Sequence, residues 1–434
     1  GHLSIQIVEG KIETIRFVTD PDQNTLRTIT AFPFMEGQVL NLKDLETSLS
    51  RINQRPSTKA TLDFVPVKGK LGYTHVQIKT EELPQERLSI RYDNSALKPL
   101  KLYPNSLTLS KDNLLNMNDG WTVVFSQTND DTAQNNNSQS VSLSLPFGRW
   151  SASLSTSRFE YMTLIDGTFG VIKSSGLSDT HQAQLTYLAT DRDGHNLSFN
   201  SGLTIKDTEN YIEDALQDVS SRKLVLGTIG GSYTLTTPHW GIWSFATTYT
   251  RSLDLDDTAK DATDITLSES HAQFEKTTID LGLTIPKHII PFQIFNWSSQ
   301  LHAQSTPVTL FTGEQMSIGD LYSVRGFRSQ SIQGDIGIRL RNEASVPMTQ
   351  TPGDGSKWFD GASLYTAADI GYVRARTEAP EDSSEGILAG GAIGIRKNVL
   401  KGISYDVTLT FPFAKPSSID YTGSQVYWQI TKSL

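Results

Sequence analysis

The chain has 434 residues and a formal net charge of −9, from 38 Lys and Arg against 47 Asp and Glu. It has no block of clustered basic residues, so we expect no nucleic-acid partner, because phosphate binding needs such clusters. It also has no cysteine, which excludes disulfides, thiolate metal sites and a cysteine nucleophile.

Residues 1–80 predict a small α/β domain. Apolar and polar residues alternate at 3–7, which predicts a strand, and a second, extended or partly helical piece follows at 12–17. Residues 25–32 predict a short helix that ends before Pro33, because the residue before a proline avoids helical geometry.

A second helix is predicted after Asn41, a good N-cap, with Asp44 at the third helical position, where a negative charge is favourable. Four apolar residues then fall at helical spacing: Leu42, Leu45, Leu49 and Ile52. Pro56 ends this helix, and two strands are predicted at 62–67 and 73–78. The resulting order is βααββ-like.

Residues 81–86 are interpreted as a linker, because Pro84 stands there among acidic residues. From Arg87 onward the chain shows alternating segments, such as 403–411, with one apolar face and one face of Ser, Thr, Gln and charged residues. The sequence contains no run of about 18 apolar residues, so it predicts no transmembrane helix. A transmembrane barrel also keeps a low mean hydropathy, because lipid-facing and lumen-facing residues alternate.

The alternating segments predict sixteen strands. They lie at 87–93, 102–111, 120–127, 139–146, 149–158, 180–190, 195–206, 221–235, 240–253, 268–285, 290–304, 332–346, 359–374, 386–396, 400–413 and 424–434. An even number lets an antiparallel sheet close with both ends on one side. The prediction is therefore a mainly β chain, with a 16-stranded antiparallel transmembrane β-barrel at 87–434.

The connections between these strands alternate in length. The short ones lie at 116–119, 147–148, 192–194, 236–239, 286–289 and 397–399. The long ones lie at 128–138, 160–179, 207–220, 254–267, 305–331 and 375–385. Transmembrane barrels combine short periplasmic turns with long external loops in this way. The connection at 347–357 does not fit, because it is too long for a tight turn.

Tryptophans near the predicted strand ends point to the same architecture. The chain contains Trp121, Trp150, Trp240, Trp243, Trp297, Trp358 and Trp428. A girdle at the membrane interface places tryptophans at such positions. A soluble β-sandwich or propeller is the alternative, but long strands with alternating loop lengths favour the membrane barrel.

The sequence shows no constellation of an enzyme. Its eight histidines lack metal-ligand spacing, and neither a Gly-x-Ser-x-Gly elbow nor a phosphate-binding glycine loop is present. We therefore predict no catalytic residues, no metal and no cofactor. Five acidic residues cluster in one loop: Asp254, Asp256, Asp257, Asp261 and Asp264. A calcium site is one interpretation of them, and a solvated external loop is the favoured one.

The candidate functional residues lie in the long connection at 305–331. It contains the tetrad Val324, Arg325, Gly326 and Phe327. An arginine at a loop tip is usually solvated. Here the flanking residues are apolar, and the glycine allows a close approach or an unusual backbone angle. We therefore predict that this loop folds back into the barrel.

Strand parity supplies a partner for Arg325. On the strand at 359–374, Leu364 and Ile370 take the lipid side, so that Asp369 and Gly371 face inward. A carboxylate there can hold a guanidinium by two charge-assisted hydrogen bonds, worth about 1–3 kcal/mol. The preceding strand adds charged residues to a predicted lumen network: Arg339, Arg341 and Glu343.

On these residues the chain resembles the outer-membrane transporters of two-partner secretion, the TpsB family, within the superfamily of POTRA-plus-barrel proteins. The barrel segments that carry the resemblance are Val324–Phe327, Gly334–Glu343, Asp369–Gly371 and Leu388–Arg396. In residues 1–80 they are Val8–Glu13, Leu40–Glu46 and Ile52–Asn53. The resemblance covers essentially the whole chain.

The resemblance implies a barrel in a Gram-negative outer membrane, with residues 1–80 as a membrane-proximal POTRA domain in the periplasm. That domain would capture a large unfolded exoprotein, such as an adhesin, a haemolysin or a contact-dependent growth-inhibition toxin. The barrel would conduct the exoprotein outward, with folding of the cargo outside as the energy source, and the inward loop would hold or gate the pore. Further implied partners are outer-membrane lipid and the barrel-assembly machinery, with the pore itself a monomer.

The chain departs from the family pattern in three places. Members usually carry a second POTRA domain and an N-terminal plug helix; neither is visible in these residues, which a truncated chain would explain. The last residue is Leu434, where an aromatic residue is usual for insertion.

Two other functions stay open at this point. A membrane-protein insertase of the same superfamily is the second interpretation, and it would be favoured by a long array of POTRA domains upstream. A passive porin is the third, and it would be favoured by a steady conductance that is unaffected when residues 1–80 are deleted.

Overall fold

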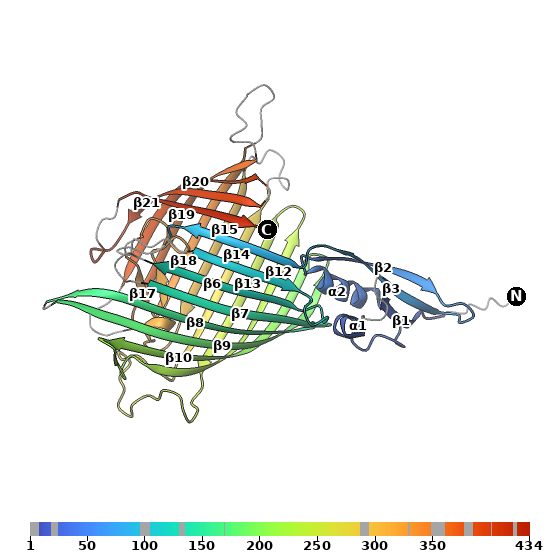
Figure 1. The fold of residues 1–434 in the computed structure, drawn as a ribbon, viewed down its shortest axis with the longest axis horizontal. Helices are drawn as coiled ribbons and strands as arrows, with labels where there is room; N and C mark the ends of the chain where they lie inside the picture. The colour runs from blue at the N-terminus through green and yellow to red at the C-terminus, as the bar shows by residue number, and fades with distance from the viewer. Residues whose placement is uncertain are drawn as a thin grey trace, which may run out of the picture.

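A computed structural model describes residues 8–18, 25–95, 105–129, 135–168, 170–286, 295–328, 330–348, 361–376, 385–400, 402–419 and 423–434. These residues form a small α/β domain that lies against one end of a closed β-barrel (Figure 1). The strand predicted at 3–7 and Trp358 lie outside the described residues. In the described part of the chain, no helix is both long enough and apolar enough to cross a membrane.

The α/β domain has five elements: β1 Lys11–Phe17, α1 Thr25–Ala31, α2 Leu42–Asn53, β2 Thr58–Pro66 and β3 Tyr73–Glu82. Its sheet has the order β1-β3-β2, with β1 parallel and β2 antiparallel to the central β3. The predicted βααββ order is confirmed, and the ambiguous piece at 12–17 is a strand. β3 continues through Glu82, so residues 83–85 separate it from the first barrel strand.

The helix α2 starts and packs as its sequence predicts. Asn41 is the N-cap, and its side chain accepts a hydrogen bond of 3.1 Å from the backbone N–H of Lys43. Leu45 and Ile52 point into the core of the domain, where they are almost fully buried. This core also contains Phe17, Val76 and Ile78.

Sixteen of the described strands form the barrel. They are β4 Glu86–Asp93, β5 Asn105–Asp112, β6 Gly120–Asn129, β7 Asn135–Phe147, β8 Trp150–Gly167, β9 Gly170–Arg192, β10 His195–Ile212, β12 Arg222–Thr237, β13 Gly241–Ser252, β14 Glu275–Ile285, β15 Asn296–Ser305, β18 Ile336–Pro347, β19 Ala362–Arg374, β20 Gly386–Leu400, β21 Ile403–Ala414 and β22 Gln425–Ser433. Neighbours are antiparallel, and β22 pairs with β4 to close the barrel. The short β11, Ala215–Leu216, pairs with the end of β10. The predicted 16-stranded antiparallel barrel is confirmed.

The predicted connections at 160–179 and 207–220 are wrong over much of their length. β8 runs to Gly167, β9 starts at Gly170 and β10 runs to Ile212. The apolar alternation used to find strands fades in these stretches. The backbone ladder continues there because strand pairing needs hydrogen bonds, not an apolar face. These three strands are therefore much longer than the roughly 9–11 residues that a bilayer requires.

Two predicted strand starts are also wrong. Residues 268–274 are irregular, because Ala272 and Phe274 are buried against Leu310 of a neighbouring loop, which draws this segment out of the ladder. The strand predicted at 332–346 is divided at Asp335, a buried residue whose carboxylate binds neighbouring backbone groups. Its first part pairs with the preceding loop.

The α/β domain sits on the short turns at one end of the barrel. The backbone N–H of Gly148, in the turn between β7 and β8, donates to the carbonyl of Thr30 at 2.7 Å. The Arg55 guanidinium donates to the carbonyl of Asn118 at 2.9 Å and to that of Ser144 at 3.0 Å. These contacts place the domain at the mouth of the barrel.

Candidate functional site

The loop between β15 and β18 folds back against the barrel wall as a hairpin. Its two short strands, β16 Met316–Ile318 and β17 Ile332–Gly334, pair antiparallel after the single turn η1 Thr312–Glu314. The fully buried Asp335 fixes the base of this hairpin. Its carboxylate accepts from the backbone N–H of Leu310 at 2.8 Å and from that of Arg376 at 2.7 Å.

Apolar residues fix the tip of the hairpin to the wall. Val324 and Phe327, on either side of Arg325, have no exposed surface. They belong to a cluster that joins the loop to β19 and β20: Met316, Ile318, Val324, Phe327, Ile332, Val373, Leu388 and Ile419. Burial of such side chains is worth about 1.5–3 kcal/mol each, so the tip has a stable seat on the barrel.

Three glycines let the backbones approach closely at this seat. Gly326 has a φ of +109°, and a Cβ on it would lie 2.8 Å from the carbonyl oxygen of Phe411 on β21. A Cβ at Gly371 would lie 2.9 Å from a methyl group of Val324, and one at Gly390 would overlap the carbonyl oxygen of Arg325. A larger residue at any of the three would therefore push the loop away from the wall.

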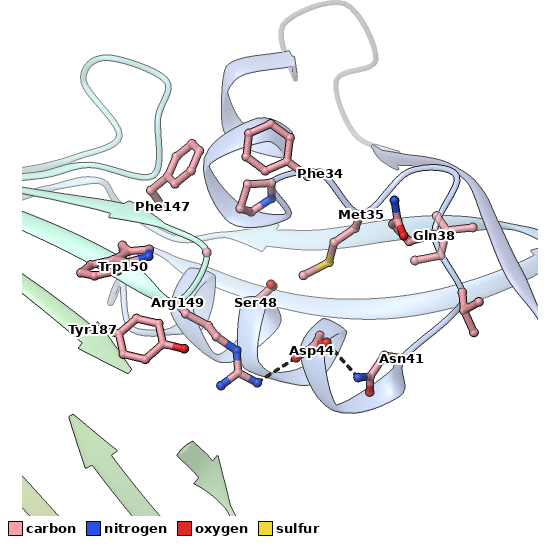
Figure 2. Close-up of a pocket in the computed structure, with 14 residues that line it drawn as sticks. Phe34, Met35, Gln38, Asn41, Asp44, Ser48, Phe147, Arg149, Trp150 and Tyr187 are labelled. Atoms are coloured by element: carbon pink, nitrogen blue, oxygen red, sulfur yellow. Dashed lines mark hydrogen bonds and ion pairs between the residues drawn. The ribbon is translucent and has the colours of Figure 1, made fainter. Parts of the chain in front are cut away.

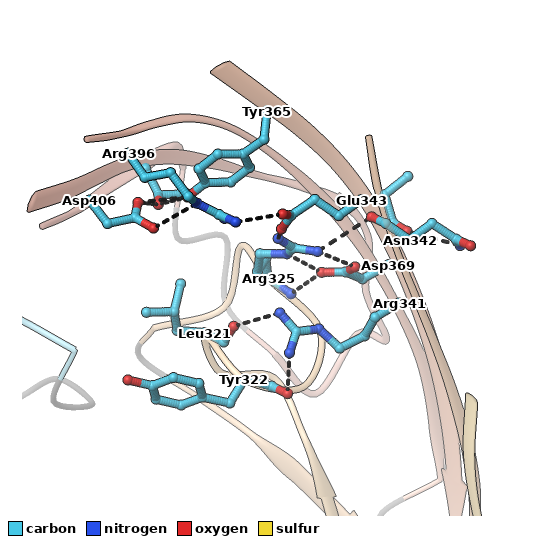
Figure 3. A network of polar contacts seen from close by, with 12 residues as sticks. Leu321, Tyr322, Arg325, Arg341, Asn342, Glu343, Tyr365, Asp369, Arg396 and Asp406 are labelled. Atoms are coloured by element: carbon cyan, nitrogen blue, oxygen red, sulfur yellow. Dashed lines mark hydrogen bonds and ion pairs between the residues drawn. The ribbon is translucent and has the colours of Figure 1, made fainter. Parts of the chain in front are cut away.

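Arg325 reaches the carboxylate of Asp369 on β19 (Figure 3). Its Nε donates to Oδ2 at 2.5 Å and its Nη2 to Oδ1 at 2.8 Å, while its backbone N–H also donates to Oδ2 at 3.2 Å. Arg325 is 4% exposed and the side chain of Asp369 is fully buried. Because the pair is bidentate and dry, loss of either partner would strand a buried charge, at about 3–5 kcal/mol.

Glu343 on β18 extends this ion pair along the wall. One of its oxygens lies 3.1 Å from Nη1 of Arg325 and the other 2.9 Å from Nη1 of Arg396 on β20. Arg396 stacks on the ring of Tyr365, whose hydroxyl donates to Asp406 at 2.8 Å. The network thus links the loop to four consecutive strands, from β18 to β21.

The two other predicted lumen residues, Arg339 and Arg341, also lie on β18. Arg341 donates to the carbonyl oxygen of Tyr322 at 2.8 Å and to that of Leu321 at 3.2 Å, so it holds the backbone of the loop rather than a carboxylate (Figure 3). Arg339 lines a cavity of about 280 Å³ together with Tyr322 and Arg341. Within the described residues it forms no ion pair, so it stands apart from the Arg325 network.

Strand parity on β19 places the residues as the alternation predicts. Tyr365 and Asp369 are buried on one face of β19, and Leu364 and Ile370 are about half exposed on the opposite face. The exposed face of such a barrel is the one that lipid would cover.

A second ion cluster holds the start of the loop. The buried Glu314 binds Lys276 on β14 at 2.8 Å and also pairs with Lys206 on β10. Burial acts to raise the pKa of Glu314, but the two lysines outweigh it and hold this pKa below its usual range. The loop is therefore tied to β10 and β14 as well as to β18–β21.

Sequence reasoning missed the residues that complete these networks. Asp335 lies between two short apolar segments, and this position is the only local signal in the sequence for its buried carboxylate. Arg396 and Asp406 stand directly opposite each other on β20 and β21, which only the strand register reveals. Glu314 has no sequence signal, because its lysines come from distant strands.

The structure also bears on the acidic loop at 254–264. Asp257 pairs with Lys223, Asp254 lies 3.2 Å from Lys260, and Asp261 accepts the backbone N–H of Gln273 at 3.3 Å. Among the described residues, no three His, Asp or Glu side chains are gathered as they would be around a metal ion. These carboxylates instead hold the loop together.

The chain matches two family models. Residues 72–397 match the family of haemolysin secretion/activation proteins ShlB/FhaC/HecB. Residues 11–66, which contain β1, both helices and β2, match the POTRA domain.

Individual relatives agree with this match over the length of the chain. The outer membrane transporter CdiB of Dickeya dadantii (strain 3937) is 28% identical over 423 residues, which cover 96% of this chain and 72% of the relative. The CdiB of Escherichia coli O6:K15:H31 (strain 536 / UPEC) is 27% identical over 440 residues, or 99% and 71%. The solved structure of CdiB from Escherichia coli superposes with a TM-score of 0.86 at 24% identity, over 98% of this chain and 77% of that one. This superposition supports the fold.

Proposed function

The chain belongs to the haemolysin secretion/activation family ShlB/FhaC/HecB, and we propose that it secretes a large, unfolded partner exoprotein from the periplasm to the cell surface. It is an outer-membrane transporter of two-partner secretion, with its barrel in the Gram-negative outer membrane and its POTRA domain in the periplasm. We propose an adhesin, a haemolysin or a contact-dependent growth-inhibition toxin as the cargo, which is the class of protein that the family resemblance implies.

One structural relationship carries this proposal. The POTRA domain packs on the short turns at the mouth of a barrel whose inward loop is anchored to the wall. A chain captured by the domain would thus be delivered directly to the lumen. The POTRA domain would hold the exoprotein as an added strand or along an apolar groove. Folding of the cargo outside would supply the driving force, and the barrel would supply a path without any catalytic step.

We further propose that the Arg325 network sets the position of the loop during transport. The loop is held at two ends, by Asp369 and Glu343 near its tip and by Lys206 and Lys276 near its start. A loop fixed in this way can brace the wall of the pore. Release of its tip or its start from the wall would change the cross-section of the pore that is open to the cargo. We also propose that the pore is a monomer in contact with outer-membrane lipid and that the barrel-assembly machinery inserts it; closure of the barrel within one chain supports the monomer.

The test is secretion of the partner by cells that carry Arg325→Ala. The partner is identified as a large secreted protein that is encoded beside this one and co-purifies with residues 1–80. We expect its export to fall sharply while the amount of barrel in the membrane is unchanged. Arg158→Ala is the matched control, because Arg158 forms a similar bidentate pair with Asp179, but on an exposed surface. Normal export by Arg325→Ala, or an equal loss in both variants, would refute the role proposed for the loop.

A further inference from the structure

A groove runs along the junction between the POTRA domain and the outside of the barrel (Figure 2). Its volume is about 680 Å³. One end is aromatic, with Phe34 from the POTRA domain and Phe147, Trp150 and Tyr187 from the barrel. The rest of the lining mixes apolar residues such as Met35 with polar ones, and the ion pair of Asp44 and Arg149, 2.8 Å apart, lies beside Tyr187 (Figure 2).

Phe34 is held toward this groove by an unusual backbone conformation. Its φ is +60°, a region that bulky residues rarely adopt, and the residue is 87% exposed. Its ring meets that of Phe147 edge to face, at 6.3 Å between centroids and an angle of 71°. A large apolar ring in a strained, solvent-exposed position points to a function outside the core of the domain.

The aromatic end is continuous with the surface of the barrel that faces lipid. Trp150 and Tyr187 are opposite each other on β8 and β9, on the same outer face as the next outward pair, Ala152 and Leu185. Trp150 and Leu185 are both close to half exposed. These rings lie at the periplasmic ends of their strands, where an interfacial girdle belongs. The groove therefore opens at the level of the periplasmic leaflet.

We propose that this groove binds one phospholipid of the periplasmic leaflet, and that Phe34 inserts into the membrane interface. An acyl chain fits the aromatic end. Beside the rings, the Asp44–Arg149 pair presents a carboxylate and a guanidinium, each 37% exposed, which complement the ammonium and the phosphate of a zwitterionic head group. The bound lipid fixes the POTRA domain at the barrel mouth. This site goes beyond secretion itself, because it depends on the membrane location and not on the identity of the cargo.

Position on the lipid-facing wall favours a lipid over an apolar segment of the exoprotein. A peptide that is bound for the lumen would have to leave this outer face and cross the rim of the barrel. A phospholipid reaches the groove from the leaflet without leaving the membrane. The peptide is therefore treated as an alternative outcome of the test.

The absence of cysteine in the chain allows a direct test by spin labelling of Phe34→Cys in the full chain. The labelled protein is placed in liposomes of phosphatidylethanolamine and phosphatidylglycerol, and the collision rates of the label with oxygen and with a water-soluble nickel chelate are measured. We expect high oxygen and low nickel accessibility. Leu71→Cys is the matched control, because Leu71 is also an exposed apolar residue, 81% exposed, on the distal turn of the same domain. Its label is expected to stay accessible to nickel.

A second variant measures the lipid itself. Phe34→Gly removes the ring and suits the positive φ, so it keeps the fold. Native mass spectrometry with added phosphatidylethanolamine should show one retained lipid fewer than in the wild type. The proposal fails if the labels at 34 and 71 are equally accessible to nickel or if Phe34→Gly retains the same lipids. It also fails if the label at 34 becomes protected only when the N-terminal segment of the exoprotein is added.

Discussion

Gly390 of β20 lies so close to the carbonyl oxygen of Arg325 that any side chain at position 390 would overlap it. The backbone of the loop therefore rests directly on the backbone of the wall. Gly326 repeats this relationship from the side of the loop, against Phe411. The seat of Arg325 is consequently steric as well as electrostatic, and the two contributions can be separated by mutation.

Gly390→Ala should displace the loop while every charged residue stays in place. Overpacking of this kind costs about 1–3 kcal/mol, which changes the population of the seated loop roughly 5- to 150-fold. Trypsin cleavage after Arg328, in the loop, should accelerate accordingly in the purified transporter, and export of the partner should fall. Gly313→Ala is the control, because Gly313 lies in the same loop with nothing within 4 Å of its added Cβ. Equal cleavage rates in the two variants would show that the close approach does not hold the loop.

Asp369→Ala should release the loop more strongly than Glu343→Ala. Asp369 is fully buried and makes three hydrogen bonds to Arg325, whereas Glu343 makes one contact with it and its side chain is 24% exposed. Removal of the buried partner should cost about 3–5 kcal/mol, and removal of the more exposed one about 1 kcal/mol.

The measurement is again the rate of trypsin cleavage in the loop, followed alongside export of the partner. The double variant Arg325→Leu with Asp369→Leu should be less damaged than Asp369→Ala alone, because it leaves no unpaired charge in the seat. If the loss of export in the double variant equals the sum of the losses in the two single variants, the unpaired buried charge is not the cause of the damage.

The elements that could be predicted from the sequence are those whose signal is local. Asn41 and the apolar spacing after it are sufficient to place α2. Alternation along each strand locates the barrel strands, and it also assigns a face to Asp369, because successive side chains of one strand point to opposite faces. The sequence of one strand is therefore sufficient to predict a partner for Arg325.

The features that could not be predicted depend on contacts between segments that are distant in the sequence. Arg396 and Asp406 become neighbours only through the register of β20 with β21. Asp335 binds backbone groups about 25 and 41 positions away along the chain. The extension of β8 and β9 is a matter of backbone pairing, which continues to Gly167 and Gly170 and which the alternation of side chains does not report.

The contribution of Glu314 should depend on pH. Its pKa is below the usual value of 4.5 in the folded protein, so the ionised form is the one that folding favours. The stabilisation is therefore complete above the unfolded pKa and is lost as the pH falls through the folded pKa. Glu314→Gln should lower the thermal stability relative to the wild type at pH 6–7, and the difference should shrink below about pH 4.5.

Thermal unfolding of both proteins across pH 3–7 measures this difference. Glu269→Gln is a suitable control, since Glu269 is an external-loop carboxylate whose pKa is also lowered but whose partner is the exposed Thr266. A difference that stays constant over the whole range would rule out the titration of Glu314 as its cause.

Arg55 should control how tightly the POTRA domain is held on the barrel. Its guanidinium donates to the carbonyls of Asn118 and Ser144 and to the hydroxyl of Ser144. Burial lowers the pKa of Arg55, although nearby carboxylates of the barrel oppose this, so the charge is held in a partly dry junction. Arg55→Ala removes three hydrogen bonds at once and should allow the domain to swing.

Gly120→Ala should weaken the hydrogen bonds of Arg55 without removing its side chain. A Cβ at 120 would overlap the Arg55 guanidinium, which is the far end of a flexible side chain and can move aside without distortion of β6. The measurement is the distribution of distances between two spin labels, one at Leu71→Cys in the domain and one at Val399→Cys at the end of β20. Both variants should broaden this distribution, and Arg55→Ala should broaden it more than Gly120→Ala. Lys59→Ala, which breaks an exposed ion pair within the domain, should leave the distribution unchanged. Because Arg55 is distant from the loop, its replacement should leave the rate of trypsin cleavage after Arg328 unchanged. A narrow distance distribution in all three variants would show that Arg55 does not fix the domain.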